Sequence, residues 1–309
     1  MMETPAHSAA PRDPEQTRGS IRRFIVDAEA LPSPKGAALR LIDLARDPNA
    51  SIDETVRVIQ TDPALTGFVV RAANAARFGG IERTLDLKRA VVRVGMQMVR
   101  AHALALSMIR EHRQTRCKRF DYNRFWTESL YTAVLMDELA VRYREFRPGE
   151  AFVLGLLASI GRLAFATAAP DEYAQVLERA AEGRVPLQLL EQQAFGFDHH
   201  ELSSVLLADW GVPTELAEVV YWQHDPEGGG FEPESRPYRL AGILQLAGGI
   251  AADSLAPAAE QGGSGIVYLR AALLELDDDD IAELTREGLK ELREWLSMIG
   301  LPPLPTKAH

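Results

Sequence analysis

The sequence predicts an all-α fold, and three observations support this prediction. Helix-start signals recur along the chain, with Ser or Asp three residues before Glu or directly before Pro. Apolar residues in the segments that follow are spaced three or four apart, which is the period of a helix rather than of a strand. Hydrophobic residues make up 46% of the 309-residue chain, so a sizeable core can be buried.

The first predicted helices follow two of these start signals. A capping box of Ser51 and Glu54 precedes an apolar run, and Asp62-Pro63 places an N-cap residue before proline at the first helical position. The helix that begins there is expected to end at Gly79-Gly80. A single further helix is predicted to carry the apolar residues of 90–104.

Two helices are predicted in the middle of the chain, over 125–143 and 151–169. The second is apolar on nearly every side, carries Arg162 near its middle and stops at Pro170. It is barely long enough to span a bilayer and contains a charge, so a helix buried inside a core is the better interpretation.

The later helices are predicted from the same start and stop signals. Asp198 and Glu201 repeat the capping-box spacing, and Gly211 and Pro213 separate two more helices. The remaining segments are an exposed loop at 224–237, a helix over about 238–253, a second loop at 257–265 and a last helix after 277–280. The four aspartates at 277–280 lack the ligand spacing of a calcium loop, and favourable interaction with the helix dipole explains them more simply.

Charge and cysteine content limit the partners and the chemistry. The formal net charge of -10 argues against duplex DNA or an anionic membrane as the main partner. A single cysteine, Cys117, allows no intrachain disulfide and no cysteine-based zinc site. Basic neighbours could lower its pKa, but an incidental surface thiol is the simpler interpretation.

Residues 83–124 are locally basic, and aromatic residues follow near 120–126. Such a stretch could hold a nucleotide or a single-stranded nucleic acid. The favoured interpretation is an exposed connection between helices whose aromatic residues anchor it in the core.

Six blocks of the sequence, in order, resemble the HDOD family. The most specific is VIQTDPALTGFVVRAANAARFGG at 58–80, with its Asp-Pro-Ala-Leu start and the later pair Asn74-Ala75. The other blocks lie at 31–48, 90–106, 120–140, 151–166 and 195–226. The resemblance implies two helical lobes: a tail at 1–20, an N-terminal lobe at 21–118, an HD-like lobe with the C-terminal helix at 119–300, and a tail at 301–309.

HDOD domains are similar to metal-dependent HD phosphohydrolases, in which His and Asp side chains hold divalent metals that activate water. By this resemblance, Glu128 stands where a catalytic relative offers His, and Ala158-Ser159 replaces the His-Asp pair. A His survives near His199 and His200, Gln223 replaces one half of a His-His pair of which His224 remains, and Gly248 stands at the final Asp. The resemblance therefore implies that catalysis and the metal cofactor have been lost. The candidate vestigial cleft consists of Glu128, Ser159, Arg162, His199, Gln223 and His224.

Each of these residues also has a structural explanation. His199 and His200 lie in the first turn after the probable Asp198 cap and are expected to be structural or surface residues. His224 begins a loop and could be solvated, and Glu128 could be an ordinary helix-surface charge. Arg162 needs an anionic partner if it is buried, and a salt bridge with Glu128 is the expectation; an anion site in the cleft is the alternative.

The expected function is a non-enzymatic bacterial signalling or regulatory module in the cytoplasm. It would act through a protein partner or a small molecule, with a nucleotide or another anion as the ligand class, and not through a membrane or nucleic acid. Two alternatives stay open: a residual metal-dependent nucleotide phosphohydrolase, and a nucleotide-binding sensor without catalysis.

Overall fold

The computed structural model describes a defined part of the chain: residues 14–28, 30–33, 36, 37, 40, 41, 44, 50–74, 83–113, 116–146, 149–183, 185–256 and 265–304. Over these residues every regular element is a helix, which confirms the predicted all-α fold. The helix predicted to run from Pro63 to Gly79-Gly80 ends at Ala73, with Asn74 already in a turn, so that prediction is wrong. Residues 79 and 80, most of the predicted loop at 257–265 and the extreme tails lie outside the described residues.

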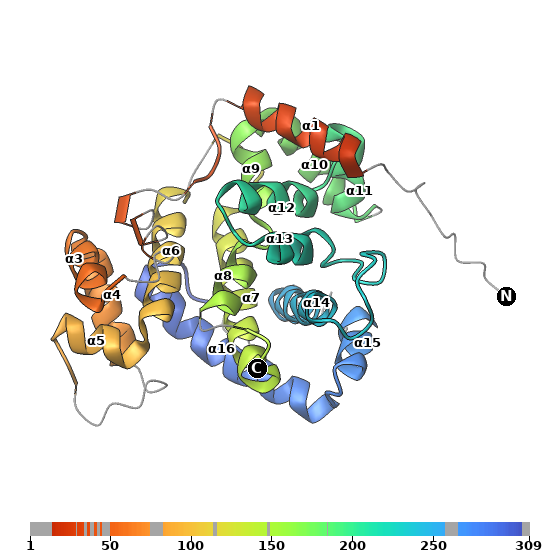
Figure 1. Cartoon of the computed structure of the whole chain (residues 1–309). Coiled ribbons are helices and arrows are strands. Elements are labelled where there is room, and N and C mark those ends of the chain that lie inside the picture. Colours follow the sequence, from red (N-terminus) through yellow and green to blue (C-terminus); the bar gives the residue numbers. More distant parts are fainter. Residues whose placement is uncertain are drawn as a thin grey trace.

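The N-terminal tail prediction is wrong for residues 14–20, which form the first half of helix α1 (Pro14–Asp27). Ile21 is fully buried, and the ring of Phe24 packs edge-on against Phe165 and Phe197 at centroid distances of 5.6 and 5.5 Å. Figure 1 shows α1 lying across the end of the molecule that carries α9 to α12. Burial of its apolar face against other helices therefore stabilises α1, although its sequence carries only weak helix-start and periodicity signals.

The next helices form the edge of the molecule at the left of Figure 1: α3 (Ile52–Gln60), α4 (Pro63–Ala73), α5 (Leu87–Val94) and α6 (Met96–Glu111). The capping box of Ser51 and Glu54 is confirmed, with both reciprocal hydrogen bonds present. The single helix expected over 90–104 is instead two helices. Gly95 between them has a φ of 92°, a backbone conformation that favours glycine and interrupts an α-helix.

Helix α7 (Tyr122–Tyr143) is the central element and includes the predicted 125–143 helix. It packs against α8 (Glu150–Leu157), where a Cβ added at Gly155 would lie 2.8 Å from the Ala133 Cα. Glycine thus allows the two backbones to approach closely. The stretch Glu150–Ala168 is long and apolar enough to cross a membrane, but 72% of its apolar window is buried inside the fold, as expected for a core helix.

The remaining helices complete the core around α7. They are α9 (Ile160–Ala168), α10 (Pro170–Ala180), α11 (Leu187–Phe195), α12 (His199–Asp209), α13 (Thr214–Tyr221), α14 (Arg236–Leu255), α15 (Gly265–Leu273) and α16 (Asp278–Ile299). The predicted cap at Asp198 is present as a capping box, and the structure shows a second capping box at Asp277, which was not predicted. Both α14 and α16 pack against α7.

The basic stretch 83–124 is not the exposed connection that was favoured, because α5 and α6 make up most of it and only residues 112–121 link α6 to α7. The expected aromatic anchor in the core is present. The aromatic residues Phe120, Phe125 and Trp126 are buried, and the Trp126 Nε1 donates to the His112 carbonyl at 2.9 Å. Several cations of the basic stretch form ion pairs with acidic side chains of other helices, among them Lys88 with Asp53, Arg110 with Asp62 and Arg119 with Glu178. The expectation that Cys117 is a surface thiol is wrong: the residue is buried, and burial raises the pKa of its thiol.

Candidate functional site

A cavity of about 400 Å³ opens between α7, α9, α12, α14 and α15. Its wall includes five of the six residues predicted for the vestigial cleft: Glu128, Ser159, Arg162, Gln223 and His224. The folding of the chain therefore brings together side chains that lie up to about one hundred residues apart in the sequence. The sixth, His199, is not part of this wall.

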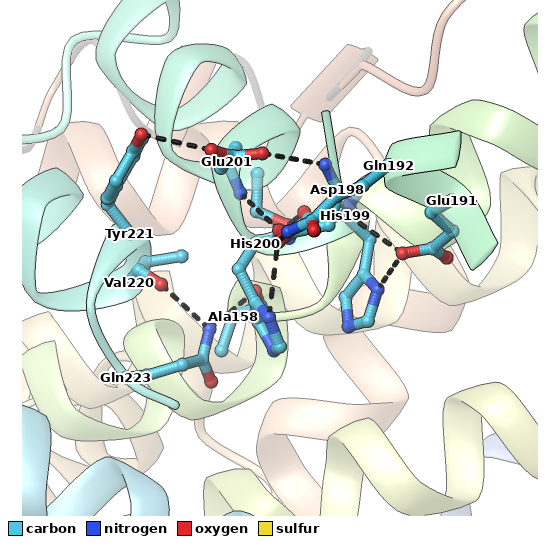
Figure 2. Close-up of polar contacts among 12 residues, drawn as sticks. Ala158, Glu191, Gln192, Asp198, His199, His200, Glu201, Val220, Tyr221 and Gln223 are labelled. Carbon is cyan, nitrogen blue, oxygen red and sulfur yellow. Dashed lines mark hydrogen bonds and ion pairs between the residues drawn. The ribbon is translucent and has the colours of Figure 1, made fainter. Parts of the chain in front are cut away.

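The predicted helix 151–169 is broken at the cavity, between α8 and α9, at Ala158 and Ser159. Tertiary contacts replace the missing helical hydrogen bonds. The Gly161 N–H donates to the Ser203 Oγ at 2.8 Å, and the Ala158 carbonyl accepts from the Gln223 Nε2 at 3.2 Å. The same Gln223 nitrogen donates to the Val220 carbonyl at 3.0 Å (Figure 2). The side chain of Gln223 thus connects α13 by hydrogen bonds to the break between α8 and α9.

The start of α12 is held by a buried set of hydrogen bonds. The Asp198 Oδ1 accepts from the backbone N–H groups of His200 and Glu201 at 2.9 and 3.1 Å. The Glu201 carboxylate accepts from the Asp198 N–H at 2.8 Å and from the Tyr221 hydroxyl at 3.0 Å. Because both acids are buried and hydrogen-bonded, this first turn of α12 is rigid and fixes the backbone of the two histidines in it.

The side chains of His199 and His200 point to different neighbours, and Figure 2 shows the His199 ring beside Glu191 and the His200 ring beside Gln223. The His199 Nδ1 lies 2.5 Å from the Glu191 Oε2, and the hydroxyl of Tyr173 donates to the other oxygen of Glu191 at 2.9 Å. Burial, and then the charge of Glu191, raise the pKa of Tyr173 well above its ordinary value. His199 is therefore a structural residue of the interior, and its inclusion in the cleft was wrong.

His200 takes the place in the cavity wall that was predicted for His199. Its ring stacks on that of His224, with centroids 5.1 Å apart and an interplanar angle of 16°. Burial, and then electrostatic repulsion of a protonated His200 by His199, His224 and Arg162, lower the pKa of His200 well below its ordinary value. His200 is therefore neutral near pH 7, and within the described part of the chain its buried Nδ1 has no hydrogen-bond partner.

The charged pair in the cavity is Arg162 and Glu128. The Arg162 Nη1 lies 3.2 Å from the Glu128 Oε2, which confirms the predicted salt bridge. The other oxygen of Glu128 lies 2.7 Å from the Arg124 Nε. Burial acts to lower the pKa of Arg162, but the charges of Tyr173 and Glu128 outweigh it, and the pKa is raised. Arg162 therefore stays ionised, and Glu128 is shared by two guanidinium groups.

These residues do not fit a divalent metal. Ala158 and Gly248 offer no ligand atom, and Ser159 offers only a neutral hydroxyl. Among the described residues of the cavity wall, Glu128 is the one carboxylate. Among the residues that the structure describes, no group of three or more His, Cys, Asp or Glu side chains could hold a metal ion. Tight binding of a catalytic dication needs several such ligands converging from different helices.

Sequence reasoning missed part of the wall. Ser129 and Thr132 on α7 and Gln188, Gln245 and Gly249 also line the cavity. Helical spacing could have found some of them, because Thr132 is four residues after Glu128 and Gln245 is three before Gly248. The local sequence cannot show whether His199 or His200 faces the cavity. Adjacent residues of a helix point their side chains in different directions, and tertiary packing decides which direction faces a cavity.

Comparison with known proteins identifies the family. The sequence profile described as HDOD domain matches residues 31–226. A solved structure of the MmoQ response regulator from Methylococcus capsulatus is 36% identical, with a TM-score of 0.51, and the match covers 83% of this chain and 98% of that one. A structure from Shewanella amazonensis SB2B, whose name proposes that it is a phosphohydrolase, is 26% identical with a TM-score of 0.65 and coverage of 91% and 96%.

A curated relative without a described function, from Treponema pallidum, is 25% identical over 210 residues, which is 67% of this chain. The match covers 39% of that relative's length. The chain therefore spans about two fifths of the relative, and the similarity concerns the shared domain only.

Proposed function

The chain belongs to the HDOD family, which is related to metal-dependent phosphohydrolases, and on this premise we propose that it is a non-catalytic signalling module. In this proposal the cavity is a regulatory pocket derived from a metal site. The output is contact with a protein partner in the cytoplasm, governed by a small molecule that occupies the pocket. The 36% identity to a protein named as a response regulator supports the signalling role.

The observation that carries the proposal is the ion pair of Arg162 with Glu128 inside the cavity. A carboxylate that is already neutralised by a guanidinium 3.2 Å away is a weak ligand for a dication. A dication bound there would also meet the positive charge of Arg162. Metal-assisted hydrolysis needs free carboxylate and histidine ligands around the metal. The ion pair occupies Glu128, and Ala158 and Gly248 have no ligand atoms, so these ligands are missing.

The test is the metal content and the hydrolytic activity of the purified, untagged chain. We expect far less than one equivalent of any transition metal by mass spectrometry, and no hydrolysis of bis(p-nitrophenyl) phosphate with added Mn²⁺. His200→Ala is the control variant, because His200 is the histidine of α12 that lines the cavity. Near-stoichiometric metal and hydrolysis that both disappear in His200→Ala would contradict the proposal.

The alternative is a residual metal-dependent phosphohydrolase. The name of the Shewanella amazonensis protein, at 26% identity, favours it. The same measurement separates the two functions, because only the phosphohydrolase requires bound metal and turnover.

A further inference from the structure

We infer that the cavity binds a small organic oxyanion, a carboxylate or a phosphate monoester, directly on Arg162 and without a metal ion. This inference rests on the proposed function, because a metal in the cavity would occupy the same space and bind the same ligand oxygens. It names the chemical class of the small molecule, and the side chain that recognises it.

The donors of Arg162 are not used up by its carboxylate partner. A guanidinium has five N–H donors in a planar fork, and this one hydrogen-bonds to Glu128, from Nη1 at 3.2 Å, and to the side chain of Tyr173. Its Nε is buried and has no hydrogen-bond partner in the part of the chain that the structure describes. The side chain keeps 25% exposure and lines the cavity. Such a fork matches a carboxylate or a phosphate group.

Glu128 does not need to leave its position when an anion arrives. Its second oxygen is held by Arg124 at 2.7 Å, so Glu128 remains paired if a ligand takes the Arg162 donor that now binds it. The formal charges of Glu128 and Arg162 cancel, and His200 is neutral. An incoming oxyanion therefore meets no uncompensated negative charge among the described residues of the wall.

The guanidinium is also held in place before any ligand binds. Its central carbon lies 6.0 Å from the ring centroid of Phe120 and 5.9 Å from that of Phe125. Both rings are buried, so they do not move easily. An arginine that is fixed in this way loses little side-chain freedom on binding, which favours affinity.

The opposite wall is small and apolar, and it fits the body of the ligand. It is formed by α14 and α15 and includes Leu244, Gly248, Gly249, Ala252 and Ile266. A Cβ added at Gly248 would meet nothing within 4 Å, so the space beside it is open. A volume of about 400 Å³ suits a compact organic molecule with one oxyanion group and an apolar part.

The test is calorimetric titration of the full chain with phenyl phosphate, benzoate and the uncharged benzamide, all in EDTA. We expect at least one oxyanion to bind and benzamide to bind about 10-fold more weakly or worse, the usual loss when a charge-assisted hydrogen bond is removed. Arg162→Gln should weaken binding of the oxyanion by a similar factor. The matched control is Arg142→Gln, which breaks an ion pair with Asp280 that lies outside the cavity wall. Whichever of phenyl phosphate and benzoate binds more tightly identifies the ligand as a phosphate ester or as a carboxylate.

Gly248→Leu is the second variant, in case Arg162→Gln does not fold. It fills the open space on the apolar wall, leaves Arg162 intact, and should also weaken binding about 10-fold or more. The inference is overturned if neither oxyanion binds, if benzamide binds equally well, or if Gly248→Leu binds like the unaltered chain. Absence of binding contradicts this inference alone, whereas binding that appears only with an added divalent cation contradicts the proposed function as well.

Discussion

At the scale of single residues, His199 and His200 have different surroundings although they are adjacent. His199 is fixed to the buried Glu191, whereas His200 stands in the cavity wall beside His224 and Arg162. Burial, and then electrostatic repulsion from His199, His224 and Arg162, lower the pKa of His200. The protonation of this one side chain is therefore coupled both to folding and to the charge of whatever occupies the cavity.

This coupling predicts how stability depends on pH. The pKa of His200 is lowered in the fold, so below about pH 6.5 the unfolded chain binds a proton that the folded chain does not. Stability from this group is thus present above pH 6.5 and falls as the pH falls, by up to about 1.4 kcal/mol per pH unit. Urea unfolding between about pH 7 and about pH 5 should show a smaller decrease for His200→Gln than for the unaltered chain. Equal slopes in the two proteins would contradict the buried neutral state of His200.

At the scale of elements, the break between α8 and α9 depends on the approach of α12. A Cβ added at Gly161 would lie 2.1 Å from the His199 carbonyl oxygen, which is backbone and cannot yield. Gly161 also donates its N–H to Ser203 on α12. Glycine at this position is therefore required for α9 and α12 to pack, and it places both Ser159 and His200 at the cavity.

Two glycine substitutions test this packing. Gly161→Ala should lower the free energy of unfolding by about 2 kcal/mol or more, because the helices must separate. Gly248→Ala is the matched control, since it adds the same methyl group in a helix but into open space. It should leave stability unchanged or raise it by about 0.5–1 kcal/mol. Similar effects of the two changes, measured by denaturant unfolding, would rule out close approach as the role of Gly161.

At the scale of the whole molecule, α16 connects the two ends of the fold. Trp295 on this helix packs against Phe68 of α4, His102 of α6 and Phe152 of α8, at centroid distances of 5.0, 4.7 and 5.0 Å. Arg71 and Arg113 donate to the carbonyls of Met298 and Ile299 at its end. We propose that the predicted lobes 21–118 and 119–300 unfold together because α16 spans both.

Trp295→Ala tests this connection. Removing a buried Trp that touches three other helices should cost about 3–5 kcal/mol and uncouple the lobes. The unaltered chain should give coincident unfolding transitions by circular dichroism and by fluorescence, whereas the variant should give separate ones. Tyr268→Ala is the control, because Tyr268 is 56% exposed. Coincident transitions in Trp295→Ala would show that other contacts couple the lobes.

The sequence by itself determined the helical class, the caps at Ser51 and Asp198, and the Arg162–Glu128 pair. These features depend on local hydrogen bonds, on spacing along one helix, or on the need of a buried charge for a partner, and all of these can be inferred from residue types. Four further members of the cavity wall, Glu128, Ser159, Gln223 and His224, were indicated only by the family resemblance.

Only the tertiary structure decided where helices break, which histidine faces the cavity and where the N-terminal residues lie. The break at Ser159 exists because Ser203 and Gln223 from other helices take over its backbone hydrogen bonds. His200 rather than His199 faces the cavity because Glu191, on α11, holds the other ring. Residues 14–20 are helical because α1 is buried against aromatic rings from distant segments. Each outcome depends on a partner far away in the sequence, so no local pattern could specify it.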